Sequence, residues 1–289
     1  MKKLYILLCG ATVALLMAAC QGGKTAAADA EAGDTLEMKY AKLLTIVKHG
    51  DGEKASGVAE GIDYQYAEAL VANPWKAGTM LHRYILIPKG EEGDKTVAML
   101  AKRRSTGARC TTDTVRTPVE RSAVFIAPHC QLMYELGCQQ AIRGVCDLDY
   151  INIPDVKKRV ALSGNTSAGI SIVDCGSSMA PDIERIIALK PEAILLSPFE
   201  NSGGYGKLDK LHVPIIEAAD YMESSPLGRA EWMKFYGMLF GKDKNISTTA
   251  AGKASGAAAG KASEAAAGKA SEAAAGKASE AAAGKASEA

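Results

Sequence analysis

Hydrogen-bonding and aromatic side chains follow three apolar runs of the sequence, at residues 123–128, 170–175 and 193–198. The candidate ligand-binding residues after these runs are His129, Ser177, Ser178, Met179, Phe199, Glu200, Asn201 and Tyr205. An imidazole could coordinate a metal or donate to a carboxylate, hydroxyl and amide groups could form hydrogen bonds, and aromatic rings could pack against a ligand. An ordinary interpretation also stands for each: a histidine that caps a helix, and polar residues that form turns.

Catalysis has less support than binding in the same part of the chain. Glu217, Asp220 and Glu223 are carboxylates near a further apolar run, but no paired nucleophile or metal triad accompanies them. The segment 203–207 (GGYGK) lacks the spacing, and the Ser or Thr after Lys, that a phosphate-binding loop requires. We therefore predict a binding protein without catalytic residues, without a metal site and without a cofactor of its own.

Apolar runs alternate with helix-like segments from residue 123 onward, and this alternation predicts which elements position the candidate ligand-binding residues. Strands are predicted at 123–128, 141–147, 170–175, 193–198 and 213–218, and helices at 131–140, 181–189 and 229–240. Such alternation is typical of a mainly parallel sheet, whose ligands gather at the carboxyl ends of the strands. Residues 37–122 are predicted to form a β-rich extension, antiparallel between residues 40 and 88. The expected fold class is α/β, a single Rossmann-like lobe with this N-terminal β decoration.

Composition and charge exclude some partners. Residues 250–289 comprise 20 Ala, 6 Gly, 5 Lys, 5 Ser and 4 Glu, so this AAAGKASE repeat cannot contribute to an apolar core. We predict a low-complexity, Ala-rich tail over 247–289 that is flexible or a fraying helix. The whole chain has a net charge of +1, and without the repeat and the first twenty residues 27 basic and 29 acidic residues remain. This near-neutral body argues against nucleic acid as a partner.

The first twenty residues are typical of a lipoprotein signal peptide. Lys2 and Lys3 precede an apolar stretch at 4–19, which is short for a membrane-spanning helix of about 20 residues. The stretch ends in two alanines before Cys20 and resembles the bacterial lipobox, in which the cysteine is lipidated. Simple cleavage beside an incidental cysteine is the alternative. With 21–36 as a tether, we expect a lipid-anchored protein of the cell envelope, on the periplasmic or surface-facing side of the membrane.

Six short segments together carry a family resemblance. They are APH at 127–129, GV at 144–145, DY at 149–150 with Pro154 after it, SMAPDIERI at 178–186, ALKPEAI at 188–194 and LHVPI at 211–215. They resemble, in the same order, the metal-chelate substrate-binding proteins of bacterial ABC importers, the group that handles iron-siderophores, haem and cobalamin. The run IERIIALKPEAI at 183–194 is the most specific, and the segments at 197–211 and 226–241 look like the Bacteroides-type branch.

The resemblance implies two α/β lobes joined by one long helix, with the ligand between them and an ABC permease as partner. It gives Glu184 a permease-docking role, because rim charges of this kind set docking orientation and rate. It gives Tyr150 a place in the cleft, where an aromatic face suits a flat macrocycle, and it would let His129 coordinate haem iron or cobalt. A solvated glutamate and a core tyrosine are the ordinary alternatives.

Only part of that architecture is expected in this chain. The resemblance assigns residues 123–228 to one ligand-binding lobe and 229–246 to the start of the connecting helix, and the repeat stands where a second lobe would follow. It therefore predicts the substrate-binding component of an importer for a metal chelate, truncated after its first lobe. A surface lipoprotein with a structural or interaction role, and without ligand transport, is the alternative.

Overall fold

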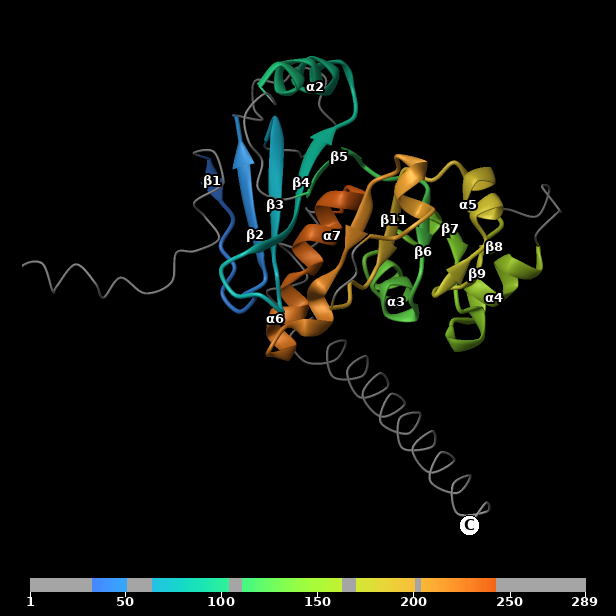
Figure 1. Cartoon of the computed structure of the whole chain (residues 1–289). Coiled ribbons are helices and arrows are strands. Elements are labelled where there is room, and N and C mark those ends of the chain that lie inside the picture. Colours follow the sequence, from blue (N-terminus) through green and yellow to red (C-terminus); the bar gives the residue numbers. More distant parts are fainter. Residues whose placement is uncertain (1–32, 51–63, 104–110, 163–169, 201–203, 243–289) are drawn as a thin grey trace, which may run out of the picture.

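Two five-stranded sheets, with helices between and around them, make up the described part of the chain (Figure 1). The structure, a computed structural model, describes residues 33–50, 64–103, 111–162, 170–200 and 204–242. The predicted signal peptide with Cys20, most of the predicted tether and the repeat tail lie outside these residues. The expected α/β class, with a parallel sheet and N-terminal strands, is confirmed.

The second sheet in chain order is parallel throughout, with the strand order β12-β11-β6-β7-β8. Its strands are β6 (Ser122–Val124), β7 (Ile142–Val145), β8 (Val173–Asp174), β11 (Ala193–Leu196) and β12 (Ile215–Glu217). Parallel strands are usually covered on both faces and therefore read as continuous apolar runs, which is why the sequence locates them. The chain winds from β6 outward to β8 and then returns to the other side of β6, so the winding direction reverses between β6 and β11.

Short helices and turns connect these strands. The α-helices are α3 (Ala127–Glu135), α4 (Pro154–Ala161) and α5 (Ile183–Leu189), and a hairpin of β9 (Gly176–Ser177) and β10 (Ala180–Pro181) precedes α5. Single turns of 3-10 helix are η4 (Gln139–Ala141), η5 (Leu148–Tyr150), η7 (Leu208–Leu211) and η8 (Ala219–Met222). The side chain of Asp182 caps α5 by accepting from the backbone N–H of Arg185 at 3.1 Å, and Lys190 ends the helix in a left-handed conformation.

The N-terminal sheet has the order β1-β2-β3-β4-β5. Its strands are β1 (Asp34–Thr35), β2 (Leu44–His49), β3 (Tyr66–Ala72), β4 (Met80–Pro88) and β5 (Thr111–Thr117). The first four pair antiparallel, as expected, but β4 and β5 are parallel because α2 (Glu91–Arg103) crosses between them. This helix, which the sequence analysis does not identify, packs Val97 and Leu100 against Tyr66 and Ile87 of the sheet.

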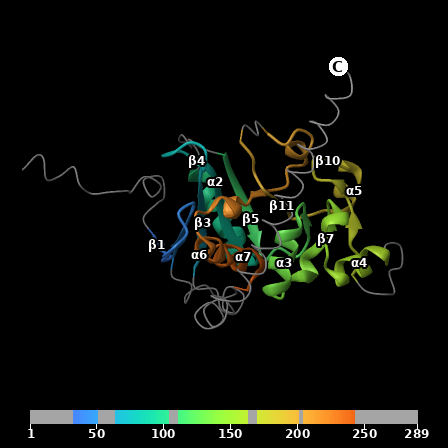
Figure 2. The same ribbon diagram turned by 90° about the horizontal axis from the view of Figure 1, so that it is seen from below.

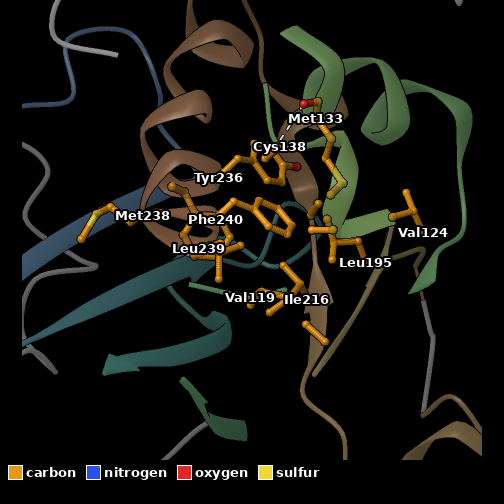
Figure 3. Close-up of a cluster of buried hydrophobic side chains, with 14 of the residues drawn as sticks. Val119, Val124, Met133, Cys138, Leu195, Ile216, Tyr236, Met238, Leu239 and Phe240 are labelled. Atoms are coloured by element: carbon orange, nitrogen blue, oxygen red, sulfur yellow. Dashed lines mark hydrogen bonds between the residues drawn. The ribbon is translucent and has the colours of Figure 1, made fainter. Parts of the chain in front are cut away.

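Two helices near the end of the described chain lie between the sheets. They are α6 (Pro226–Glu231) and α7 (Met233–Phe240), and both views show α7 between the N-terminal sheet and the parallel sheet (Figures 1 and 2). Tyr236, Leu239 and Phe240 of α7 belong to one buried cluster with Leu195 and Ile216 of the parallel sheet (Figure 3). The single helix predicted at 229–240 is therefore two helices joined at Trp232, and α7 is a core element that Gly241 ends at φ 66°.

Two carboxylates hold the start of the described chain against α6. Glu231 accepts from the backbone N–H groups of residues 39, 40 and 41 at 2.9, 2.6 and 2.7 Å. Glu223 accepts from the backbone N–H groups of Lys42 and Leu43 and from the indole N–H of Trp232, at 2.9–3.0 Å. We call this arrangement the N-terminal clamp. It fixes the segment before β2 to the far end of the fold.

Candidate functional site

The carboxyl ends of the five parallel strands share one edge of the sheet, which we call the carboxyl edge. In Figure 1, α3 lies directly beyond the end of β6 at this edge. Because the winding reverses between β6 and β11, the segments that follow these two strands diverge, and open α/β sheets bind their ligands at such a switch point. The topology therefore selects this edge, near β6 and β11, as the candidate site.

Large apolar side chains are exposed along the carboxyl edge. Eight such side chains are exposed in the described part of the chain, and five of them follow strands of the parallel sheet: Tyr150, Met179, Phe199, Tyr221 and Met222. We call these five the apolar edge residues. Tyr150 is 78% exposed and Met179 is 83% exposed, so neither contributes to the core. Exposed apolar side chains that gather at one place are more informative than scattered ones, because they are typical of binding surfaces.

Asp147 connects two of the segments that carry apolar edge residues. It follows β7, and its carboxylate accepts from the backbone N–H of Ser178 at 3.0 Å and from the Ser178 hydroxyl at 2.5 Å. Ser178 and the exposed Ser177 belong to the β9–β10 hairpin, whose tip carries Met179. Asp147 thereby holds the hairpin beside the turn that leads to Tyr150.

A second connection lies on the other side of β6. The hydroxyl of Tyr221, after β12, donates to the carbonyl of Pro198 at 2.5 Å, next to Phe199 after β11. Burial, and then the neighbouring Asp220, raise the pKa of Tyr221, so the phenol stays neutral and keeps donating. The apolar edge residues thus form two linked groups that flank the end of β6.

Tyr205 is half-buried, unlike the apolar edge residues. Its ring packs against a buried cluster that includes Leu208, and its hydroxyl donates to Glu217 Oε1 at 2.7 Å. These two contacts leave less of the side chain available to a ligand than the prediction assumed. A tyrosine side chain has an apolar ring and a polar hydroxyl, so the ring can pack under the loop while the hydroxyl forms a hydrogen bond. Tyr205 holds the loop after β11 to the end of β12.

Glu217 also joins the parallel sheet to the N-terminal sheet. Its Oε2 lies 2.8 Å from Nδ1 of His82, whose Nε2 lies 3.3 Å from Asp113 Oδ2. The His82 ring stacks on Tyr84 at 4.3 Å between centroids, and the Tyr84 hydroxyl accepts from the Glu217 backbone N–H at 2.7 Å. Burial alone would lower the pKa of His82, but the hydrogen bonds and charges of Asp113 and Glu217 outweigh it and raise that pKa.

His129 lies inside the protein, with 1% of its surface exposed. Its Nε2 is 3.5 Å from Asp220 Oδ1, and its ring is tilted against Tyr236 with 5.8 Å between centroids. The ring therefore contacts α7 and η8 rather than the surface of the carboxyl edge, which corrects the expectation that it faces a ligand. The alternative as a helix cap is wrong as well, since α3 has no side-chain cap.

The remaining predicted residues lie at or near the edge. Glu200 is exposed beside Phe199, whereas Asn201 lies outside the described residues. Glu184 is exposed in the first turn of α5, which begins directly after the β9–β10 hairpin.

The three carboxylates that the sequence singled out as acid–base candidates have structural partners. Glu217 contacts His82 and Tyr205, Asp220 contacts His129, and Glu223 belongs to the N-terminal clamp. Within the residues that the structure describes, no group of three His, Cys, Asp or Glu side chains could hold a metal ion. None of the helices in that same part of the chain has the length and apolar character needed to cross a bilayer.

Sequence reasoning missed Asp147, Tyr221 and Met222. A usable signal existed, because Asp147 is the last residue of the strand predicted at 141–147, and Tyr221 and Met222 follow the strand predicted at 213–218. Asp147 additionally occupies a left-handed conformation at φ 51°, which Asp adopts more readily than most residues. Position at or just after the carboxyl end of a strand is therefore the sequence signal that these three residues share with the predicted candidates.

The fold and the edge together define an open α/β protein with an exposed apolar surface at its topological switch point. No protein-family model matches the chain. Over 73 residues it is 33% identical to an uncharacterized lipoprotein of Methanocaldococcus jannaschii, and the match covers 25% of this chain and 18% of that protein.

Three solved structures illustrate the similarity in fold. They are the petrobactin-binding protein YclQ of Bacillus subtilis (22% identity, TM-score 0.33), the siderophore-binding protein BauB bound to two acinetobactin molecules and ferric iron (26%, 0.35), and the periplasmic haem-binding protein HutB of Vibrio cholerae (12%, 0.34). The matches cover 47%, 46% and 45% of this chain and 44% of each of those proteins. The chain thus spans less than half the length of the proteins it is compared with.

Proposed function

We propose that this chain is the lipid-anchored, extracytoplasmic ligand-binding component of an ABC importer for a metal chelate: an iron-siderophore, haem or cobalamin. Residues 1–20 would be the signal peptide, Cys20 the lipidated residue and 21–36 the tether, while 123–228 would form the one ligand-binding lobe. The importer class follows from the motif resemblance, above all the run at 183–194. The whole role, including the permease partner, is part of the proposal.

The observation that carries the proposal is the exposure of the apolar edge residues at the topological switch point. Five large apolar side chains remain in contact with water there, although the same fold buries large apolar side chains elsewhere. A ligand that covered them would gain roughly 25 cal/mol for each Å² of apolar surface removed from water. A binding surface for a ligand with an apolar face explains this exposure.

The spacing of the two linked groups supports a ligand larger than a metal ion. β11 and β7 flank β6, so their ends are two strand spacings apart, or about 10 Å. Phe199 follows one of these strands and Tyr150 the other. A chelate or macrocycle can touch both groups at once, whereas a bare ion cannot. Ser177 and Glu200 are exposed beside these rings and would supply the polar contacts.

Docking to a permease is assigned to Glu184. The side chain is exposed in the first turn of α5, and the helix begins at the same edge as the ligand-binding hairpin. A charge placed there would orient the protein on a basic permease surface while its ligand faces the same way. This role rests on the motif resemblance and on the exposure of the side chain.

Binding of defined probes to the purified full chain tests the proposal. We expect ferric desferrioxamine B, haemin or cyanocobalamin to raise the melting temperature, by an amount that follows the ratio of free probe to Kd. Tyr150→Ala and Phe199→Ala should each weaken binding of that probe about tenfold or more. Tyr40→Ala is the matched control, because Tyr40 is another exposed tyrosine but lies in the N-terminal clamp.

Two results would count against the proposal. One is the absence of any shift with all three probes at a large excess over micromolar affinity, which would favour the structural or interaction lipoprotein instead. The other is equal loss of binding in Tyr40→Ala and Phe199→Ala, which would remove the carboxyl edge as the site.

A further inference from the structure

Asp147 stands out because of its backbone. Its φ of 51° and ψ of 46° lie in the left-handed region, and among the described residues only Lys190 and His212 share this property outside glycine. The left-handed conformation is unfavourable for a residue with a Cβ atom, although Asp tolerates it better than most. A residue keeps this unfavourable conformation only where surrounding contacts hold it in place. The contacts of Asp147 therefore indicate the structural role of this residue.

Three hydrogen bonds join Asp147 to the β9–β10 hairpin. The backbone N–H of Asp147 donates to the Gly176 carbonyl at 2.8 Å. One carboxylate oxygen accepts from the Ser178 N–H at 3.0 Å, and the other accepts from the Ser178 hydroxyl at 2.5 Å. Both carboxylate oxygens of Asp147 therefore bind Ser178. This pairing fixes the orientation of the hairpin as well as its distance from Asp147.

Few other hydrogen bonds from the described residues hold the β9–β10 hairpin in position. Each of its strands has two residues, and isolated two-stranded hairpins are marginal in water. Its other described bonds to neighbouring chain lie at its base, where the Gly176 N–H donates to Asp174 and the Asp182 N–H donates to the Cys175 carbonyl. Among the described residues, only Asp147 forms hydrogen bonds from outside the hairpin to the residues near its tip, where Met179 is exposed.

We propose that Asp147 is a positioning residue of the ligand site. It fixes the tip of the hairpin, with Ser177 and Met179, against the segment that carries Tyr150. The hairpin tip and the Tyr150 segment are thereby held in one relative orientation before the ligand binds. Preorganised surfaces bind better because less freedom is lost on binding. The ligand part of this inference rests on the proposed function, whereas the holding of the hairpin does not.

Two substitutions separate the carboxylate from the backbone conformation. Asp147→Gly keeps the left-handed backbone accessible and removes both acceptors. Asp147→Asn also tolerates this conformation, and its side chain can accept from the Ser178 N–H and donate to the Ser178 hydroxyl. Ser178→Ala is a milder variant that removes one of the two side-chain bonds. Lys190→Gly is the matched control, since it changes another left-handed residue at the end of α5.

Amide hydrogen exchange over residues 176–181 of the full chain is the first measurement. We expect Asp147→Gly to speed exchange at Ser178 about tenfold or more, Ser178→Ala to speed it less, and Asp147→Asn and Lys190→Gly to leave it near the wild-type rate. Unchanged exchange at Ser178 in Asp147→Gly, with the protein still folded, would overturn the inference.

Affinity for whichever of ferric desferrioxamine B, haemin or cyanocobalamin binds the wild type is the second measurement. Asp147→Gly should weaken it about tenfold and Asp147→Asn should restore it. A hairpin loosened by Asp147→Gly together with wild-type affinity would overturn the positioning role. If the wild type binds none of the three, the proposed function and ligand positioning are contradicted together, and exchange alone still decides whether Asp147 holds the hairpin.

Discussion

The imidazole of His82 and the carboxylate of Glu217 meet at 2.8 Å between the two sheets, although the residues are 135 positions apart in the chain. Because Glu217 also binds the hydroxyl of Tyr205, this pair connects the N-terminal sheet to the loop that follows β11. The N-terminal sheet is thus in contact, through two side chains, with a segment of the candidate site.

The His82–Glu217 pair predicts a pH dependence of stability. Asp113 and Glu217 raise the pKa of His82 above 6.5 despite the opposing effect of burial, which is larger than any single one of their contributions. The charged ring therefore stabilises the fold fully below the unfolded pKa of about 6.5, and this contribution is lost as the pH rises through the raised pKa. Urea unfolding of the wild type and His82→Gln across neutral and alkaline pH measures it.

The stability advantage of the wild type over His82→Gln should shrink as the pH rises. His212→Asn is the control, because His212 is exposed and Asn tolerates its left-handed backbone. The difference in unfolding free energy between the wild type and His212→Asn is the baseline for the His82→Gln comparison. A constant difference between wild type and His82→Gln over the whole range would contradict the prediction.

The N-terminal clamp should contribute measurably to stability. Glu231→Ala leaves three backbone N–H groups without their acceptor and should lower the free energy of unfolding by roughly 1–3 kcal/mol. Glu231→Gln keeps one acceptor oxygen and should lose less. Glu184→Ala, at an exposed helix position, should stay within about 0.5 kcal/mol of the wild type. A loss in Glu231→Ala no larger than that of Glu184→Ala would argue against the clamp.

Gly144 in β7 has no room for a side chain. A Cβ atom there would lie 2.4 Å from Leu189 Cδ1 and 2.9 Å from Cys175 Sγ. Gly144→Ala should therefore cost roughly 1–3 kcal/mol of unfolding free energy. Combining it with Leu189→Ala should cost less than the two single changes added together, because the smaller side chain removes the closest contact. Additive losses in this double-mutant cycle would mean that the clash is relieved elsewhere.

The buried cysteines should resist alkylation in the folded protein. Cys130, Cys138, Cys146 and Cys175 are free and buried, and burial raises the pKa of each thiol, to about 12 for Cys130 and Cys138 and about 11 for Cys175. Because the thiolate is the nucleophile, iodoacetamide at mildly alkaline pH should modify them only after unfolding in urea. Peptide mass spectrometry before and after unfolding measures this, and rapid labelling of Cys175 in the native state would be inconsistent with it.

Much of the parallel sheet was predictable because its strands are continuous apolar runs. The runs at 193–198 and 213–218 contain β11 and β12, and the helix predicted at 181–189 contains α5. β3 was not predictable in the same way. Its sequence, YAEALVA, is rich in residues that favour helix, yet it is a strand because β2 and β4 on either side satisfy its backbone.

The candidate site was predictable only as a set of segments. Spacing after a strand indicates that Tyr205 and His129 lie near the carboxyl edge, but not which way their side chains point. That direction depends on Glu217 and Asp220, which are 12 and 91 positions away from them. A local pattern carries no information about such partners, so both residues were assigned to a ligand although each has a hydrogen-bonding partner within the protein.

The N-terminal clamp also sets an order of events during synthesis. The backbone N–H of Lys39 pairs with a carboxylate 192 positions later, so this early segment has to wait for α6 before it can dock. Contacts of such long range form late and slow folding, since a large loop must close first. A chain that emerges amino end first would therefore keep the segment before β2 undocked until its last core helices arrive.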